Sequence, residues 1–315
     1  MSSNLTPDLS TELAGVRLAN PVMTASGTSG YGPEYASYID INALGAFVTK
    51  SVTLHERAGN PHPRTVETAS GMLNAIGLAN VGLERFIVEK VPFLADLDVP
   101  VVVNVAGHNL DDYCTVCQRL DEIDCLDILE LNVSCPNVDD GLEWGTQPDR
   151  LERLIAAVRP LVRRCRLMVK LTPNTSDVAA LARAAINAGA DILSMINTLR
   201  GMAIHADTRR PLLANVSGGL SGPAIKPVAL YMVHEVYRKV ARELNVPIVG
   251  MGGIRTWRDA VEFMLAGATA VAVGTASFQD PRLLPAVVEG IAAYLASHGE
   301  RRVTDITGRV VLPTR

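Results

Sequence analysis

The sequence has no long apolar run and no excess of positive charge. None of its 315 residues lies in a stretch that approaches the roughly 18 uninterrupted apolar residues of a membrane-spanning helix, which argues against a membrane protein. Lys and Arg number 29 against 33 Asp and Glu, a formal net charge of −4, whereas a nucleic-acid-binding surface needs concentrated cations. Hydrophobic residues make up 48% of the chain, so it is not disordered and can bury a large core without disulfides or metals.

The sequence is also poor in cysteine and shows no export signal. Its first ten residues contain neither a basic segment nor an apolar one, so we expect a reduced, cytoplasmic setting. Cys114 and Cys117 form a lone pair without the second pair of an iron–sulfur or zinc site, and no histidine has an obvious metal partner. We therefore expect no bound metal, and we expect Cys114, Cys117, Cys125 and Cys165 to serve packing.

Short β-branched runs alternate with longer stretches of helical periodicity along the chain. Nearly all of eight such runs are apolar on both faces, as parallel strands covered by helices are: 22–26, 46–51, 101–106, 128–133, 167–171, 192–197, 247–251 and 270–274. Apolar residues three and four apart predict helices over 151–158, 178–186, 257–265 and 284–295. Helix caps are predicted at 174–177, and helix ends at Gly189 and Gly267.

This alternation predicts an α/β protein with a (β/α)8 TIM barrel, formed as one domain over residues 1–315. A doubly wound sheet is the alternative, although it usually has fewer strands for this length. Residues 1–20 are expected to form a hairpin that closes the lower end of the barrel. Connections 52–81, 134–148 and 198–222 are too long for turns, and we expect them as long βα loops over the active face.

Polar residues occur where the predicted strands end. Two of them, Lys50 and Lys170, lie in otherwise apolar strands, where a buried ammonium is costly unless an anion compensates it. Neither strand presents an adjacent carboxylate, so a bound anionic ligand is the expected partner rather than a salt bridge. The other polar residues at strand ends are Ser26, Ser51, Asn104, Asn132, Asn197 and Thr198.

Glycine loops follow the seventh and eighth predicted strands, the usual phosphate position of this barrel. Without Cβ atoms, Gly252, Gly253 and Gly274 let backbone N–H groups approach an anion, and Thr275 adds a hydroxyl. Tight turns are the simpler explanation for either loop alone, but both together favour phosphate binding. Cys135, on the loop after the fourth strand, is a candidate nucleophile or general base.

Together these motifs resemble the dihydroorotate dehydrogenase family, from about residue 13 to about residue 295. The segments that carry the resemblance, besides the two glycine loops, are 26–27, 50–51, 59–64, 72–78, 104–107, 132–137, 170–174, 195–199 and 218–222. The resemblance implies a barrel that carries one FMN and oxidises (S)-dihydroorotate to orotate in pyrimidine (UMP) biosynthesis.

The resemblance also implies a class. A cysteine base and a short N-terminal segment are similar to the soluble class 1, and segment 197–202 resembles class 1B more than the fumarate-using class 1A. Class 1B implies a homodimer joined to a partner subunit, which carries FAD and a [2Fe–2S] cluster and passes electrons to NAD, in a heterotetramer. Fumarate and a quinone remain alternative electron acceptors.

By resemblance, Cys135 removes the C5 proton of dihydroorotate while hydride leaves C6 for the flavin N5. The implied substrate-binding residues are Lys50, Asn74, Ala75, Ile76, Gly77, Leu78, Asn132, Asn137, Asn197 and Thr198. The implied FMN-binding residues are Ser26, Lys50, Ser51, Asn104, Asn132, Lys170, Ile196, Gly222, Gly252, Gly253, Gly274 and Thr275. Lys170 is placed at the flavin N1–C2=O edge.

Two other functions remain open. A dihydropyrimidine dehydrogenase-like enzyme has a similar flavin barrel, but its substrate lacks the carboxylate that gives Lys50 its purpose. A non-redox, phosphate-binding barrel fits the glycine loops but leaves both lysines and Cys135 unexplained. The acidic segment 138–144, which includes Trp144, departs from the family, and no role is assigned to the tail after His298.

Overall fold

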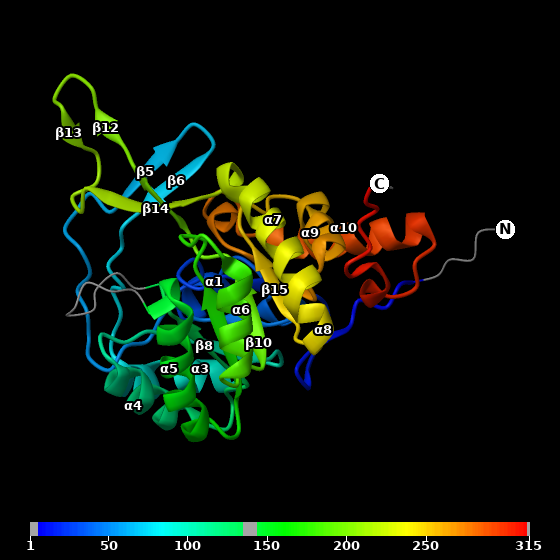
Figure 1. The fold of residues 1–315 in the computed structure, drawn as a ribbon, viewed down its shortest axis with the longest axis horizontal. Coiled ribbons are helices and arrows are strands. Elements are labelled where there is room, and N and C mark those ends of the chain that lie inside the picture. The colour runs from blue at the N-terminus through cyan, green and yellow to red at the C-terminus, as the bar shows by residue number, and fades with distance from the viewer. Residues whose placement is uncertain (1–5, 135–143, 314–315) are drawn as a thin grey trace.

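A closed barrel of parallel strands forms the centre of the protein (Figure 1). The computed structural model describes residues 6–134 and 144–313. Its eight-stranded sheet has the order β3-β16-β15-β10-β9-β8-β7-β4. These strands are β3 (Val22–Thr24), β4 (Phe47–Val48), β7 (Val101–Val105), β8 (Ile128–Asn132), β9 (Arg166–Leu171), β10 (Ile192–Met195), β15 (Ile248–Met251) and β16 (Ala270–Val273).

The two ends of this sheet are joined, which confirms the barrel and excludes the doubly wound alternative. A parallel bridge pairs Met23 with Ala46. The Thr24 hydroxyl accepts a hydrogen bond from the Val48 N–H at 2.7 Å and donates one to the Val48 carbonyl at 3.2 Å. An open α/β sheet would leave both edges unpaired.

Helices follow the strands and cover the outside of the barrel. The cap predicted within 174–177 is present, since the Asp177 side chain accepts from the Ala180 N–H at 2.9 Å. A capping box of Thr256 with Asp259, which was not predicted, begins α9, and the predicted Gly267 caps its end. A π-helical turn, Tyr237–Ala241, joins α7 to α8. The helices are α1 (Pro33–Ala36), α2 (Leu83–Glu89), α3 (Val91–Ala95), α4 (Leu110–Asp121), α5 (Pro148–Val158), α6 (Val178–Asn187), α7 (Lys226–Val236), α8 (Arg242–Leu244), α9 (Trp257–Ala266) and α10 (Leu283–His298).

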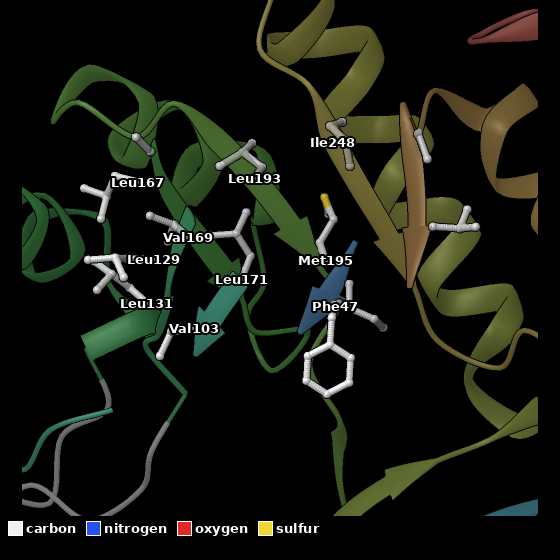
Figure 2. Packing of buried hydrophobic residues seen from close by; sticks show 14 of the residues in the cluster. Phe47, Val103, Leu129, Leu131, Leu167, Val169, Leu171, Leu193, Met195 and Ile248 are labelled. Atoms are coloured by element: carbon white, nitrogen blue, oxygen red, sulfur yellow. The ribbon is translucent and has the colours of Figure 1, made fainter. Parts of the chain in front are cut away.

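Alternation along each strand divides the core into two clusters. Side chains one residue apart point to opposite faces of a strand, so alternate residues of each strand belong to different clusters. The outward cluster packs under the helices, and Figure 2 shows part of it: Phe47, Val103, Leu129, Leu131, Leu167, Val169, Leu171, Leu193, Met195 and Ile248. The inward cluster fills the barrel and includes Val102, Ile128, Met168 and Ile192.

The N-terminal hairpin closes the lower end of the barrel, as the sequence predicts. Strands β1 (Thr11–Leu13) and β2 (Val16–Leu18) pair antiparallel. Leu13 and Leu18 are fully buried and belong to the inward cluster, so the hairpin is part of the barrel core.

Above the opposite end, two of the three predicted loops form a second sheet. Strands β5 (Thr65–Thr68) and β6 (Gly71–Asn74) come from segment 52–81, and β11 (Leu199–Met202) and β14 (Ser217–Ser221) come from segment 198–222. They pair antiparallel in the order β11-β14-β6-β5, and the short hairpin of β12 (Ile204–His205) and β13 (Arg210–Pro211) projects beyond them (Figure 1). Both segments are long βα loops over the active face, as predicted; the strands inside them were not predicted, because they form only where backbone groups of two distant segments pair. Most of the third loop, 134–148, lies outside the described residues.

Candidate functional site

A cavity of about 810 Å³ lies at the C-terminal ends of the barrel strands, where it meets the second sheet. Its volume is within the range of sites that enclose a small molecule or cofactor. The barrel supplies residues at or just after the C-terminal ends of β3, β4, β8, β9, β10, β15 and β16. The upper sheet supplies most of the residues from 65 to 74, together with Ser221. The site therefore lies on the face on which TIM-barrel active sites are built.

Most of the predicted site residues line this one cavity. They are Ser26, Lys50, Ser51, Asn74, Ile76, Leu78, Asn132, Lys170, Ile196, Asn197, Thr198, Gly222, Gly252, Gly253, Gly274 and Thr275. Cys135 and Asn137 lie outside the described residues.

Three predicted residues do not line the cavity. Asn104 is fully buried behind Ser51, whose hydroxyl donates to the Asn104 Oδ1 at 2.5 Å. Ala75 and Gly77 belong to the segment that packs against Asn60, because the Asn60 Nδ2 donates to the Ala75 carbonyl at 3.0 Å. A Cβ on Gly77 would lie 2.6 Å from the Asn60 backbone nitrogen, so that glycine permits close packing of two chain segments.

The two lysines differ in their surroundings. Lys50 is half-buried, and burial lowers the pKa of its ammonium from the ordinary 10.5; nearby Arg64 lowers it further, and Glu34 opposes both. Lys170 is almost fully buried, and its Nζ lies 4.0 Å from a carboxylate oxygen of Glu130 on the neighbouring strand β8. The expectation that neither lysine has an adjacent carboxylate was thus wrong for Lys170.

Sequence reasoning missed Glu130, although a signal for it was present. Positions 128, 130 and 132 alternate with the apolar positions that face the helices, so Glu130 had to point into the barrel. It is 2% exposed, and it accepts hydrogen bonds from the Asn104 Nδ2 and the Ser194 hydroxyl, both at 2.6 Å. The lining residues of the cavity that sequence reasoning missed include Glu67, Ser70, Arg255 and Phe278, for which no local pattern pointed to a site.

Amide side chains from three elements line the same cavity as the lysines. The Asn197 Nδ2 donates to the Asn132 Oδ1 at 3.2 Å, and the Asn197 Oδ1 accepts from the Thr198 N–H at 2.8 Å. On the upper sheet, the Asn74 Nδ2 donates to the Gly219 carbonyl at 3.2 Å. These contacts fix the orientation of each amide, so this part of the cavity presents an ordered set of donors and acceptors.

The glycine-rich end of the cavity is crowded. Gly222 and Gly253 have φ values of +89° and +79°, which L side chains rarely adopt. A Cβ on Gly253 would lie 2.8 Å from the Gly222 carbonyl oxygen. The Thr275 hydroxyl lies 2.8 Å from the Ser221 hydroxyl, to which it donates. Backbone and hydroxyl groups thus lie close together at this end of the cavity, as an anion site requires.

The four described cysteines lie away from the cavity. Burial raises the pKa of the Cys117 thiol well above its ordinary value and that of Cys165 to about 12. Burial also raises the pKa of Cys114 and Cys125. Thiols with raised pKa values are poor nucleophiles and bases at neutral pH.

Neither a metal cluster nor a membrane span is found among the residues that the structure describes. No group of three or more His, Cys, Asp or Glu side chains is placed there to hold an ion. In the same ranges, no helix combines the length and apolar character needed to cross a bilayer.

Comparison with known proteins gives one consistent result. The family model described as dihydroorotate dehydrogenase matches residues 8–295. A relative from Pelobacter propionicus is 54% identical over 303 residues, 96% of this chain and 98% of the relative. Relatives from Geotalea daltonii (52% over 303 residues, 96% and 98%) and Geotalea uraniireducens (51% over 306 residues, 97% and 99%) are similar. All three are named the catalytic subunit of dihydroorotate dehydrogenase B (NAD(+)). The chain therefore belongs to the dihydroorotate dehydrogenase family, in the class of these B-type enzymes.

Proposed function

We propose that this chain, as a single domain, catalyses the FMN-dependent oxidation of (S)-dihydroorotate to orotate in pyrimidine biosynthesis. One observation carries the proposal: two lysines, a set of oriented amides and a glycine-lined anion site share a single cavity of about 810 Å³. A flat, anionic substrate and a phosphate-bearing planar cofactor together need this combination. Family membership supports the same conclusion.

The residues present fit FMN. At the glycine-rich end, a side chain on Gly253 would clash with the Gly222 carbonyl. The absence of that side chain lets backbone N–H groups approach a phosphate. The buried Lys170 supplies a positive charge in the wall of the same cavity, which Ser51 and Ile196 also line. We assign the phosphate to Gly222, Gly252, Gly253, Gly274 and Thr275. We assign the ring to Ser26, Lys50, Ser51, Asn132, Lys170 and Ile196, with Asn104 acting through Ser51. FMN, when bound, supplies the two-electron acceptor.

Substrate recognition falls to the residues nearest the upper sheet. Lys50 is the cation available to the substrate carboxylate, and an anion beside it would offset the cost of its burial. Since the Asn132 oxygen accepts from Asn197, the Asn132 Nδ2 is the end that can donate to a ring carbonyl. We assign the remaining substrate contacts to Asn74, Ile76, Leu78, Asn137, Asn197 and Thr198, with Ala75 and Gly77 shaping the segment.

We assign the general base to Cys135, which would remove the C5 proton of dihydroorotate. The assignment rests on its sequence position, three residues beyond Asn132, the last residue of β8. The four described cysteines support it by contrast, since their burial makes them poor bases. Loss of a general base typically costs about 10²–10⁴-fold in rate.

The relatives' names support a route for the electrons. Because those proteins are NAD(+)-linked catalytic subunits, we propose that electrons leave this chain for NAD through a partner subunit with FAD and a [2Fe–2S] cluster. We propose a homodimer of this chain within a heterotetramer, in the cytoplasm.

The test begins with the purified protein incubated with FMN. We expect one FMN bound per chain and bleaching of its absorbance by dihydroorotate under anaerobic conditions. A chain that stays colourless would refute the flavoenzyme and favour a non-redox barrel. Orotate should perturb the flavin spectrum where uracil does not; the reverse would favour a dihydropyrimidine dehydrogenase-like enzyme. Reoxidation by fumarate, but not by NAD with a partner subunit from the native host, would favour class 1A.

A further inference from the structure

A buried polar cluster lies inside the barrel directly below the cavity. Asn104, Glu130, Lys170 and Ser194 each stand two residues beyond an inward apolar residue of β7, β8, β9 and β10. Strand register places Glu130 opposite Asn104 and Ser194 opposite Lys170. All four are at most 7% exposed. Of these, only Lys170 reaches the cavity wall, so the others act from behind it.

Glu130 is the centre of this cluster. Its two carboxylate oxygens accept from the Asn104 Nδ2 and the Ser194 hydroxyl, each at 2.6 Å, while the Lys170 ammonium lies 4.0 Å away. Burying a carboxylate costs several kcal/mol unless donors and an opposite charge surround it. A packed apolar residue at this position would avoid that cost. We therefore expect the Glu130 carboxylate to have a role in the cavity above it.

A chain of hydrogen bonds from Glu130 through Asn104 determines whether Ser51, in the cavity wall, donates or accepts. A carboxylate only accepts, so it faces the Nδ2 of Asn104 and turns the Asn104 Oδ1 toward Ser51. The Ser51 hydroxyl has one proton, and it donates that proton to the Asn104 Oδ1 at 2.5 Å. Ser51 lines the cavity and can therefore only accept a hydrogen bond from a ligand there.

The negative charge of Glu130 also affects Lys170, which lies in the cavity wall. Lys170 has a side chain that is 9% exposed, and it faces both the cavity and the carboxylate. The reduced cofactor carries more negative charge than the oxidised one, so an isolated ammonium would stabilise the reduced form strongly. A carboxylate 4.0 Å from that ammonium offsets part of this effect.

We propose that Glu130 is a positioning residue that sets the redox potential of the cofactor, by partly neutralising Lys170 and by fixing Ser51 as a hydrogen-bond acceptor. The inference rests on the proposed function, since it requires FMN in the cavity. It assigns a role to a residue that never touches substrate or cofactor.

The test compares the FMN-loaded wild type with Glu130→Gln, which removes the charge and keeps the shape. We expect the flavin midpoint potential of the variant to be more positive than that of the wild type. Sulfite, an anion that adds reversibly to oxidised flavins, should bind at least about threefold more tightly, because Lys170 is then less compensated. An unchanged potential and unchanged sulfite affinity would overturn the inference.

Ser194→Ala is the matched control. It removes one hydrogen bond to Glu130 at 2.6 Å and leaves every charge in place. A role in packing alone would give both variants similar losses of stability and no shift of potential. We expect Ser194→Ala to keep a potential near that of the wild type; an equal shift in both variants would contradict the charge mechanism.

A third variant protects the test against a folding failure. Glu130→Asp keeps the charge but withdraws the carboxylate by one methylene from Asn104 and Lys170. We expect a smaller positive shift of potential, and no shift would count against the proposal. A wild-type chain that binds no FMN would refute the proposed function, whereas FMN binding with identical potentials in all variants would refute only this inference.

Discussion

A Cβ atom on Gly253 should damage the phosphate end of the cavity. Gly253 has φ +79°, a conformation in which alanine is strained by about 1–2 kcal/mol. The added atom would also lie 2.8 Å from the Gly222 carbonyl oxygen and 3.1 Å from the Lys226 backbone nitrogen. Both neighbours are backbone, so they cannot move aside as a flexible side chain would.

The expected magnitude follows from these two contributions. Overpacking of a tight site typically costs about 1–3 kcal/mol, so Gly253→Ala should lower the free energy of unfolding by about 2–5 kcal/mol in total. Because the strain is released by moving the same loop that is proposed to hold the phosphate, FMN affinity should fall as well.

Gly299→Ala separates the two contributions. Gly299 ends α10 with φ +71°, and a Cβ there would meet nothing within 4 Å, so it suffers only the backbone cost of about 1–2 kcal/mol. Urea denaturation of both apoproteins measures stability, and quenching of FMN fluorescence measures affinity. The reasoning is refuted if Gly253→Ala is no less stable than Gly299→Ala, or if both variants bind FMN as the wild type does.

Three further predictions concern the base, the substrate cation and the lower end of the barrel. Cys135→Ala should slow flavin reduction by dihydroorotate at neutral pH by about 10²–10⁴-fold in stopped-flow measurements, and an unimpaired variant would remove Cys135 from its role. Burial lowers the pKa of Lys50, and only its charged form attracts a carboxylate. Orotate affinity, followed by flavin absorbance, should therefore weaken as pH rises through that lowered pKa. Lys50→Met should bind orotate weakly without this pH dependence, and an unchanged pH profile would exclude Lys50 as the cation. Leu13→Ala, which empties a fully buried position of the hairpin, should cost about 2–5 kcal/mol by thermal or urea denaturation. Its FMN spectrum should not change, and a loss of less than about 1 kcal/mol would show that the hairpin is not part of the core.

Prediction from the sequence succeeded where the signal was local. Short β-branched runs, apolar on both faces, located the barrel strands, and the predicted helix cap at Asp177 is formed by residues close in sequence. The positions of the site residues followed, because parallel strands in a barrel bring their C-terminal ends to one face. The cavity accordingly unites residues as distant in sequence as Ser26 and Thr275.

Prediction from the sequence failed where the interacting residues are distant in sequence. Segments 52–81 and 198–222 carry no strong alternation of their own, and only their mutual pairing makes them strands; Asn74 pairs with Gly219 across the sheet. Asn104 was predicted to touch the cofactor, yet it lies behind Ser51, because a strand-end position alone does not tell which side chain stands in front.

The sequence by itself determined the barrel, its hairpin plug and the face that carries the chemistry, since each follows from periodicity and chain order. Only the tertiary structure decided which polar groups meet. Glu130 and Lys170 lie forty residues apart in sequence, and nothing local reveals that the pairing of β8 with β9 brings their charges to 4.0 Å. Electrostatic interaction depends on distance in space and on burial, and both are properties of the folded chain.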